Sequence, residues 1–460
     1  MTRPATSYDG APVVVAGAGL SGAAAARALR SLGAAVTVAE RDSERSEALR
    51  SEGFAVADLA TPPPGTALVV VSPGWRPDAP LLTAAEQAGV ELIGEVELAW
   101  RLRPPGAAPW LAVTGTNGKT TTVRMLAAIL EAGGERTVAA GNVGLPVLDA
   151  VLAPEPYDVL AVELSSFQLH WSSSLQSAAA AILNIAPDHL DWHGSLEAYA
   201  AAKARIWAGP VCMGNADDEI VRTLLSRSVV AAGGARRVTF TLRTPRDGEL
   251  GLVQDLLVDR AFPDVPGEAT ELAELGDLLV PGAHNVANAL AAAGLARSHG
   301  VSAEAVRAGL RAFRPDPHRN ALVATIDGVA WVDDSKATNP HAAAASLAAY
   351  DDVVWIAGGL LKGATVDDLV RTAAPGLAGV VLLGTDREIL RQALRRHAPQ
   401  IPVVEVARLD TEAMVEAVAA ARLLATRGGT VLLAPAAASM DCFRDYAQRG
   451  ELFAAAVRAL

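Results

Sequence analysis

Short apolar runs alternate with alanine-rich helical segments along almost the whole chain. The runs are rich in Val, Leu and Ile, which predicts buried strands. They lie at residues 13–16, 36–39, 68–71, 111–114, 159–163, 353–357 and 431–434. Alternation of strands with helices is typical of parallel sheets with crossover helices, so we predict an α/β fold.

Two proline-rich stretches interrupt this pattern and predict domain boundaries. Residues 103–109 precede a fresh strand at Trp110, and residues 314–317 precede another strand-rich segment. We therefore predict three domains over residues 1–106, 107–314 and 315–460. Residues 239–280 contain short strand-like pieces and acidic turns, and their pattern does not predict how these pieces are arranged.

Composition narrows the class of protein. Hydrophobic residues make up 51% of the chain and the net charge is −12, a poor match for a nucleic-acid or anionic-membrane binder. Gly, Ser or a charge interrupts every apolar stretch before the roughly 18 residues of a membrane span. Two cysteines are too few for a disulfide framework. We expect a cytoplasmic protein without nucleic-acid or membrane partners.

The basic residues are unevenly divided between the two cation types. Of the 39 lysines and arginines, only Lys119, Lys203, Lys336 and Lys362 are lysine. Genome composition accounts for the bias toward arginine. Because arginine is the usual cation of this chain, the sequence around each of the four lysines can indicate a position where lysine is needed.

A glycine-rich turn follows the first predicted strand. Gly17-Ala-Gly-Leu-Ser-Gly22 opens a helix, and Glu40 ends the next strand. This arrangement matches the dinucleotide fingerprint, in which glycines admit a pyrophosphate to a helix N-terminus and an acid binds a ribose. A second turn, Ser72-Pro-Gly74, follows the third strand on the same edge. The motif alone leaves NAD(P), FAD, another nucleotide or a structural turn open.

A more specific motif follows the strand at 111–114. Gly115-Thr-Asn-Gly-Lys-Thr120 leads into a helix predicted from about Thr121 to Ala132. Backbone N–H groups of such a loop cradle phosphates, Lys119 can bridge them, and the Thr120 hydroxyl can reach Mg²⁺. Val113 stands where the usual loop has glycine, so the loop is a shortened variant.

Metal-ligand candidates follow in the same predicted domain. Glu163 ends a strand beside the loop, where a Mg²⁺ carboxylate belongs. Residues 184–193 carry two histidines and two aspartates in a turn-rich stretch, and an isolated histidine such as His193 is equally compatible with a structural role. Lys203 lies in a helical segment, where this chain otherwise uses arginine.

Together these residues resemble the Mur ligase family of ATP-dependent amide-forming enzymes. The matching motifs occur in family order, at 115–120, 141–144, 163–168, 188–189, 202–206, 284–288, 317–319, 334–339, 358–363 and 434–443. Residues 334–339 (Asp-Ser-Lys-Ala-Thr-Asn) and the Ser-containing motif at 434–443 resemble the D-glutamate-adding member. The Asp-Asn-Pro-Arg segment of the diamino-acid-adding relative is absent from the sequence.

The resemblance implies a Rossmann-like N-terminal domain for a UDP-sugar, a central phosphate-loop ATP domain with a mostly parallel sheet, and a Rossmann-like C-terminal domain for an amino acid. The implied UDP-sugar residues are Gly17, Gly19, Leu20, Ser21, Glu40, Ser72, Gly74, Asn142 and Ser165. The family pattern often has Arg two positions beyond the acid, where this chain has Asp42, so the uracil contacts stay open. The implied ATP residues are Gly115, Thr116, Asn117, Gly118, Lys119, Thr120, Thr121, Asn285, Asn288, Arg319 and Asp334.

The resemblance also implies two Mg²⁺ sites, one held by Thr120 and Glu163, the other by His189 and a carbamylated Lys203. Carbamylation converts a repelling ammonium into an anionic oxygen ligand. The implied catalytic residues are Lys119, Glu163, His189 and Lys203. The implied D-glutamate residues are Lys336, Thr338, Lys362, Ser439, Met440 and Tyr446, although Tyr446 is equally compatible with core packing.

The implied reaction moves the γ-phosphoryl group of ATP to the terminal carboxylate of UDP-N-acetylmuramoyl-L-alanine. The amine of D-glutamate then attacks the acyl phosphate, and phosphate leaves through a tetrahedral intermediate in peptidoglycan precursor synthesis. We expect a monomer. The alternatives are another Mur ligase, a folylpolyglutamate synthase, a Rossmann oxidoreductase with a degenerate ATPase domain, or a non-enzymatic nucleotide-gated binding protein.

Overall fold

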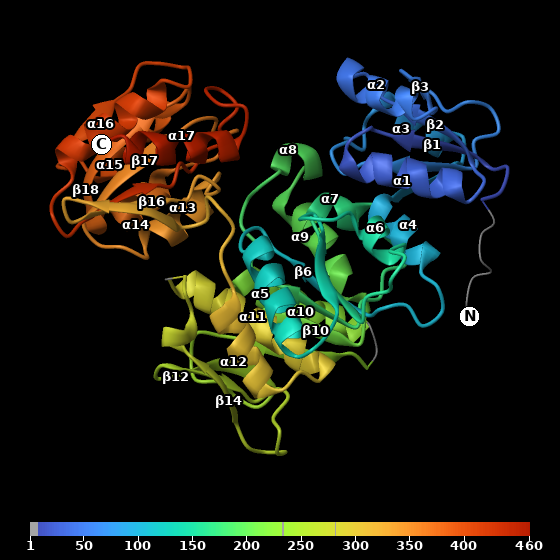
Figure 1. The fold of residues 1–460 in the computed structure, drawn as a ribbon, viewed down its shortest axis with the longest axis horizontal. Helices are drawn as coiled ribbons and strands as arrows, with labels where there is room; N and C mark the ends of the chain where they lie inside the picture. The colour runs from blue at the N-terminus through green and yellow to red at the C-terminus, as the bar shows by residue number, and fades with distance from the viewer. Residues whose placement is uncertain (1–7, 232–233, 281) are drawn as a thin grey trace. The chain divides into compact units, whose positions relative to one another are not determined.

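The structure is a computed structural model that describes residues 8–231, 234–280 and 282–460 (Figure 1). The chain forms two compact units. The first comprises residues 1–185, 189–277 and 287–312, and the second comprises 186–188, 278–286 and 313–460. Three sheets, mostly parallel, confirm the predicted α/β class. Among the described residues, no helix is long and apolar enough to cross a membrane.

The first sheet has five parallel strands in the order β3-β2-β1-β4-β5. Its strands are β1 (Pro12–Ala16), β2 (Ala35–Ala39), β3 (Ala55–Ala57), β4 (Leu68–Val71) and β5 (Glu91–Gly94). Its helices are α1 (Leu20–Ser31), α2 (Ser43–Ser51), α3 (Pro80–Gln87) and α4 (Glu95–Leu102), shown in blue in Figure 1. The strand order reverses between β1 and β4, which is where ligands of such sheets bind.

The second sheet, also in the first unit, has nine strands in the order β14-β13-β12-β11-β10-β9-β6-β8-β7. The strands that carry site motifs are β6 (Trp110–Thr114), β7 (Thr137–Gly141), β8 (Val159–Glu163) and β9 (Ala179–Ile182), followed by β10 (Val211–Asn215). The stretch of unclear layout at 239–280 completes this sheet. After β11 (Arg236–Phe240), strands β12 (Glu249–Val253), β13 (Leu256–Asp259) and β14 (Thr270–Glu274) form an antiparallel extension.

The helices of this central segment connect the parallel strands. They are α5 (Lys119–Ala132), α6 (Val147–Val151), α7 (Ser166–His170), α8 (Leu190–His193), α9 (Leu196–Ala204), α10 (Glu219–Ala231), α11 (Ala283–His299) and α12 (Ala303–Ala312), with 3₁₀ turns at Arg205–Ala208 and Leu275–Asp277. Helix α5 packs on β8 and α12. It begins at Lys119, two residues before the predicted start, because Gly118 at its N-cap adopts the left-handed conformation that ends the loop.

The third sheet belongs to the second unit and has the order β15-β16-β20-β17-β18-β19. Its strands are β15 (Ala321–Ile326), β16 (Val329–Asp333), β17 (Val353–Gly358), β18 (Leu377–Leu383), β19 (Val403–Glu405) and β20 (Thr430–Leu433). Only β15 runs antiparallel to its neighbour. The helices are α13 (Pro340–Leu347), α14 (Asp367–Ala373), α15 (Arg387–His397), α16 (Ala413–Leu424) and α17 (Tyr446–Arg458), with a 3₁₀ turn at Ala374–Gly376.

All seven apolar runs predicted as strands are strands, with ends that differ by at most one residue. Their side chains are buried, apart from the half-buried Val36 and Thr37, because crossover helices cover both faces of a parallel sheet. One apolar cluster includes residues from both sheets of the first unit, among them Ile93, Trp110 and Leu164. The predicted boundaries at 106 and 314 stay a prediction, although each sheet lies within one of the three predicted ranges.

Candidate active site

The phosphate-loop motif forms a strand–loop–helix unit between β6 and α5. Gly118 has φ +83°, and a Cβ there would lie 2.4 Å from Oδ1 of Asn288. Only glycine therefore fits this position without strain. Thr120 and Thr121 lie in the first turn of α5, where unpaired helix N–H groups favour an anion.

Two residues outside the predicted site brace this loop. Asn184 accepts a hydrogen bond from Asn117 N at Oδ1 (2.8 Å) and donates from Nδ2 to Asn117 O (3.1 Å). The hydroxyl of Tyr199 lies 3.0 Å from Oγ1 of Thr116. Asn184 directly follows an apolar strand, and this position in the sequence could have identified it. Tyr199 lies in a helical segment, where no sequence signal indicates a role at the loop.

Two of the four lysines converge on one carbonyl of the loop. Lys119 Nζ donates to Gly115 O (3.0 Å) and Thr116 O (2.8 Å). Lys203 is 1% exposed, and its Nζ donates to the same Gly115 O at 2.8 Å and lies 3.4 Å from Thr114 Oγ1. The Lys203 ammonium also lies 4.7 Å from the centroid of the Tyr199 ring. The structure therefore places Lys203 directly beside the phosphate loop.

The carboxylate of Glu163 lies at the end of β8, next to the loop strand. Glu163 pairs in register with Val113 of β6 on one side and Gly141 of β7 on the other. The side chain is 1% exposed; its Oε1 accepts from Asn142 Nδ2 at 2.8 Å, and its Oε2 has no hydrogen-bond partner. A buried carboxylate oxygen without a donor is costly by itself and fits a bound cation.

Asn142 and Ser165, both predicted to contact the UDP-sugar, make hydrogen bonds at and just after the end of β8. Asn142 binds Glu163 through its side chain and through its own N–H, which donates to Glu163 O at 2.9 Å. Ser165 caps α7 in a reciprocal box with Gln168. Their hydrogen bonds therefore serve the carboxylate and the helix start, and a sugar contact by either stays a prediction.

His189 and His193 belong to an aromatic cluster on α7, α8 and α9. The His189 ring lies 4.7 Å from the Phe167 ring, edge to face, and His189 has a left-handed φ of 52° at the N-cap of α8. His193 Nε2 lies 2.9 Å from Ser166 Oγ. Burial lowers the pKa of His193 to about 4, helped by the charges of His170, His189 and Lys203. His193 is thus neutral at pH 7 and is positioned by packing.

Candidate metal ligands include the acidic, imidazole and thiol side chains. In the parts of the chain that the structure describes, no three or more His, Cys, Asp or Glu side chains form a group that could hold a metal ion. Mg²⁺ accepts hydroxyl, phosphate and carboxylate oxygens and keeps waters. The residues near the loop fit one such ion through Glu163 Oε2 and the Thr120 hydroxyl.

The glycine turn after β1 meets the turn after β4, as predicted. A Cβ on Gly17, whose φ is +101°, would lie 2.7 Å from Ser72 Oγ, and Ser72 Oγ lies 3.4 Å from Gly17 O. Gly19 precedes α1 as its N-cap, and Leu20 is 80% exposed in its first turn, followed by Ser21. Gly74 lies in the turn after Ser72, where a Cβ would meet nothing within 4 Å.

Glu40 and Asp42 are both used by local backbone. Glu40 Oε2 accepts from Ala18 N of the glycine turn at 2.8 Å, and Oε1 accepts from Arg41 N and Asp42 N. Partial burial raises the pKa of Glu40, but these backbone bonds outweigh it and lower the pKa overall. Asp42 caps α2 through Arg45 N. Asp42, which stands where the family pattern often has Arg, is therefore the N-cap residue of α2.

The second unit holds the remaining predicted nucleotide residues, apart from Asn288. Asp334 Oδ1 accepts from Asn320 N at 3.1 Å and Oδ2 from the Ser346 hydroxyl. Burial raises its pKa to about 6, and the nearby Arg319 charge opposes that rise. Asn285 lies near the start of α11 and is 5% exposed. How these groups approach a nucleotide stays a prediction.

Three loops of the second unit bring the predicted D-glutamate residues together. Lys336 Nζ lies 3.6 Å from the Tyr446 ring centroid, so Tyr446 serves the lysine rather than the core. Thr338 lies in the turn that follows, and its N–H donates a hydrogen bond to Lys336 O. The Lys362 loop pairs with the last loop through Leu360 and Ala438 (N···O 2.8 and 2.9 Å), adjacent to Ser439 and the 69% exposed Met440.

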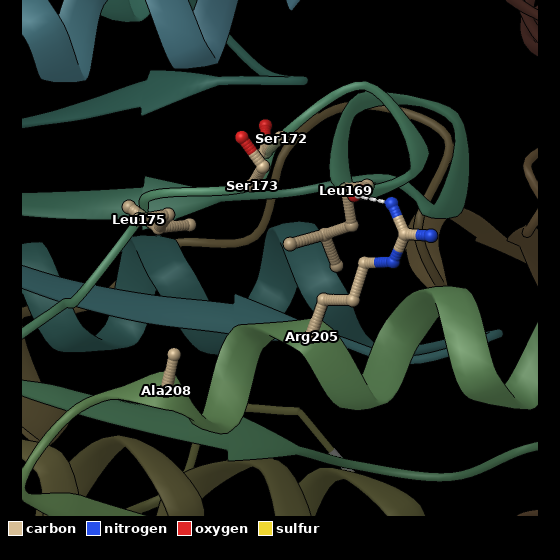
Figure 2. Close-up of a pocket in the computed structure, with 6 residues that line it drawn as sticks. All are labelled: Leu169, Ser172, Ser173, Leu175, Arg205 and Ala208. Atoms are coloured by element: carbon tan, nitrogen blue, oxygen red, sulfur yellow. Dashed lines mark hydrogen bonds between the residues drawn. The ribbon is translucent and has the colours of Figure 1, made fainter.

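A depression of about 400 Å³ lies in the first unit, with its lining side chains drawn in Figure 2. Arg205 Nη1 donates there to Leu169 O. The lining residues, none of which was predicted as a site residue, are Leu169, Ser172, Ser173, Leu175, Arg205 and Ala208.

The phosphate loop, its lysine pair and the strand-end carboxylate of Glu163, whose Oε2 has no hydrogen-bond partner, define a phosphate-loop nucleotide-binding protein. Residues 113–296 match the Mur ligase middle domain, and residues 318–437 match the Mur ligase glutamate ligase domain. Residues 5–63 match the alanine dehydrogenase/PNT C-terminal domain, a shorter match confined to the first sheet.

Two relatives match along their whole length, and both are named UDP-N-acetylmuramoylalanine–D-glutamate ligase. The Thermobifida fusca protein is 64% identical over 98% of this chain and 99% of its own, and the Streptomyces avermitilis protein is 59% identical over 99% of each. The solved UDP-N-acetylmuramate–alanine ligase of Thermotoga maritima shares the fold, with a TM-score of 0.58, 21% identity and coverage of 97% and 99%. The chain belongs to the Mur ligase family.

Proposed function

We propose that the protein is an ATP-dependent ligase that joins D-glutamate to UDP-N-acetylmuramoyl-L-alanine in peptidoglycan precursor synthesis. The observation that carries this proposal is 64% identity, over 98% of the chain, to a relative of that name. The site geometry supports the reaction class, since the described phosphate loop lies next to a buried carboxylate that fits a cation. We also expect a monomer, and the use of ATP is consistent with a cytoplasmic location.

Lys119 and the N-terminus of α5 perform the phosphoryl-transfer part of this reaction. The ammonium and the helix N–H groups offer positive charge where negative charge builds on the moving phosphoryl group. Catalysis of this kind consists of positioning and charge neutralisation. The phosphoryl acceptor is the terminal carboxylate of the UDP-sugar substrate, and the product of this step is an acyl phosphate.

The acidic and hydroxyl oxygens near the loop would hold Mg²⁺. Glu163 and Thr120 would hold one ion, which neutralises phosphate charge when bound. We assign a second ion to His189 and a carbamylated Lys203. In support, Lys203 is 1% exposed and lies 2.8 Å from the loop carbonyl of Gly115. Addition of CO₂ to the neutral amine releases one proton and leaves an anionic carbamate.

The amino-acid substrate binds in the second unit. D-glutamate carries two carboxylates, and Lys336, Lys362 and the Ser439 hydroxyl offer matching donors on neighbouring loops. The amine of D-glutamate attacks the acyl carbonyl, and phosphate leaves as the amide forms. The UDP part of the other substrate is assigned to the Gly17–Gly22 turn and its neighbour at Ser72.

The test of this function is phosphate release from ATP by the purified protein. Release should require UDP-N-acetylmuramoyl-L-alanine and D-glutamate together, and L-glutamate, L-alanine or diaminopimelate should not replace D-glutamate. Binding of NAD to the wild-type protein, without such release, would favour the oxidoreductase alternative that the match at residues 5–63 leaves in view.

Lys203→Ala tests the carbamate assignment. Because an alanine carries no ligand oxygen, we expect loss of most activity, on the order of 10²–10³ in kcat. Short-chain carboxylic acids should restore part of it by supplying the missing carboxylate. Lys203→Arg is the matched control: it keeps a cation, cannot be carbamylated and should not be rescued. Wild-type activity in the alanine variant would remove Lys203 from the mechanism.

A further inference from the structure

Arg449 is a buried cation that belongs to none of the predicted sites. It lies one turn into α17, and its side chain is 0% exposed. Within the described parts of the chain it forms no ion pair. Its three hydrogen bonds go to neutral acceptors: Nε to Ser335 Oγ (2.9 Å), Nη2 to Ser335 O (2.8 Å) and Nη1 to Ala437 O (3.1 Å).

These acceptors belong to two of the three loops that carry the predicted amino-acid site. Ser335 precedes Lys336, and Ala437 lies two residues before Ser439. A single guanidinium therefore bridges both loops. Ala436 N also donates to Ala337 O at 2.9 Å, so the loops already touch where Arg449 joins them.

The same helix fixes the first loop at a second point. Ser335 Oγ donates to Tyr446 O at 2.7 Å, and the Tyr446 ring lies under the Lys336 ammonium. One turn further on, Gly450 leaves room for His318, whose Nδ1 lies 2.6 Å from Asp333 Oδ2. A Cβ on Gly450 would lie 2.1 Å from His318 Nδ1.

Burial of a cation among neutral acceptors is expensive. Burial lowers the pKa of Arg449 to about 10, while the more distant charges of Asp441 and Asp333 favour the cation. The group therefore stays protonated at pH 7. A well-packed apolar residue would avoid this desolvation cost. Arginine offers donors in a rigid planar fork, which an apolar side chain or lysine cannot reproduce.

We propose that Arg449 is a positioning residue for the amino-acid substrate, because it holds the loops of Lys336 and Ser439 in one fixed arrangement. The inference rests on the proposed function, since it takes the substrate of these loops to be a dicarboxylic amino acid. Arg449 has no exposed surface and acts only through the loops. Its loss should therefore affect D-glutamate binding before it affects ATP binding.

The experiment compares Arg449→Lys and Arg449→Met with Phe453→Leu. Lysine keeps the charge but loses the fork, and methionine loses both. Phe453 is equally buried and lies one turn further along α17, in an apolar cluster with Trp331, so its variant loses packing but none of the hydrogen bonds that Arg449 makes to the loops. Steady-state kinetics, melting temperature and hydrogen exchange of the peptides 334–339 and 434–443 are measured on each full-length protein.

We expect both Arg449 variants to raise the KM for D-glutamate by on the order of 10- to 100-fold, because small displacements of binding groups cost this much. The KM for ATP should change by less than about twofold. Hydrogen exchange should accelerate in the two loop peptides. Phe453→Leu should lower the melting temperature and leave the KM for D-glutamate and the exchange of peptide 334–339 unchanged.

An unchanged KM for D-glutamate, or an equal rise in Phe453→Leu at equal loss of stability, overturns the proposal. Unaltered exchange in both loop peptides does the same. If Arg449→Met does not fold, Arg449→Lys and Ser335→Ala carry the comparison. A wild-type protein that releases no phosphate with D-glutamate refutes the proposed function instead, and the exchange data then decide separately whether Arg449 holds the two loops.

Discussion

Two glutamates on α4 have opposite electrostatic situations and predict opposite responses to neutralisation. Glu95 is 2% exposed; its Oε1 accepts from Leu148 N at 2.7 Å, whereas Oε2 has no partner. Burial raises its pKa from 4.5 to about 7, the Leu148 bond opposes the rise, and the Asp149 charge adds to it. The carboxylate is thus poorly supported in its ionised form.

The sign of the pH dependence follows from this rise. Between the unfolded pKa of 4.5 and the folded value of about 7, the folded protein binds more protons, so stability falls as pH rises. At 1.36 kcal/mol per pKa unit the full loss is about 3 kcal/mol, of which about 2.5 kcal/mol falls between pH 5 and pH 8. Glu95→Gln removes this titration. Its buried amide adds a cost of about 1 kcal/mol that does not depend on pH.

The assay is the difference in melting temperature between Glu95→Gln and wild type, measured from pH 5 to pH 8. Other titrating groups cancel in this difference. For a unit of about 300 residues, 2.5 kcal/mol corresponds to roughly 4 °C. We therefore expect the variant to gain about 4 °C on the wild type as pH rises through this window. A difference that is constant with pH would refute the reasoning.

Glu97→Gln is the matched control, two residues further along α4. Burial raises the pKa of Glu97, but hydrogen bonds from Ser174, Ser173 and Arg101 outweigh it and lower the pKa overall. The ionised form is therefore stabilised above pH 4.5, and this stability is lost as pH falls through the folded pKa. Its neutralisation weakens the charge-assisted hydrogen bonds from Ser173, Ser174 and Arg101, although Arg101 keeps its pair with Glu91, so we expect destabilisation of about 2 kcal/mol at pH 7. Stabilisation of both variants would show that burial alone dominates.

Two further predictions concern the sites. Gly118→Ala should lower kcat/KM for ATP by on the order of 100-fold, because its Cβ would lie 2.4 Å from Asn288 Oδ1 and displace the loop; near-normal ATP kinetics in a folded variant would contradict this. Tyr446→Ala should raise the KM for D-glutamate roughly fivefold through loss of the Lys336 contact, a cation–π energy of about 1 kcal/mol. Tyr446→Phe keeps the ring and should behave as wild type, and an equal defect in both variants would assign the effect to the hydroxyl.

The sequence alone was sufficient for the fold class and the motif positions, because these depend on local patterns. Apolar runs of strand length are buried wherever helices cover both faces of a sheet, so the seven predicted strands were found. The phosphate loop was recognisable because glycine is required where φ is positive, as at Gly118. The start of α5 differed by two residues, since the cap geometry at Gly118 decides it.

Contacts between distant segments could not be predicted from local patterns. The packing of α9 brings Lys203 to Gly115, 88 residues away in the chain. The edge meander at 239–280 was equally unpredictable, because edge strands pair by register and not by apolar runs.

The four lysines illustrate the division between what the sequence determines and what the tertiary structure decides. Their scarcity and their motifs are properties of the sequence, and they identified four positions for which a flexible amine suits better than a guanidinium. Tertiary structure decided that Lys119 and Lys203 share one carbonyl and that Lys336 lies over an aromatic ring. It also showed where the fold requires arginine: the fork of Arg449 joins two loops that the sequence separates by more than 100 residues. Such a role is set by which backbone groups folding leaves within reach of one side chain.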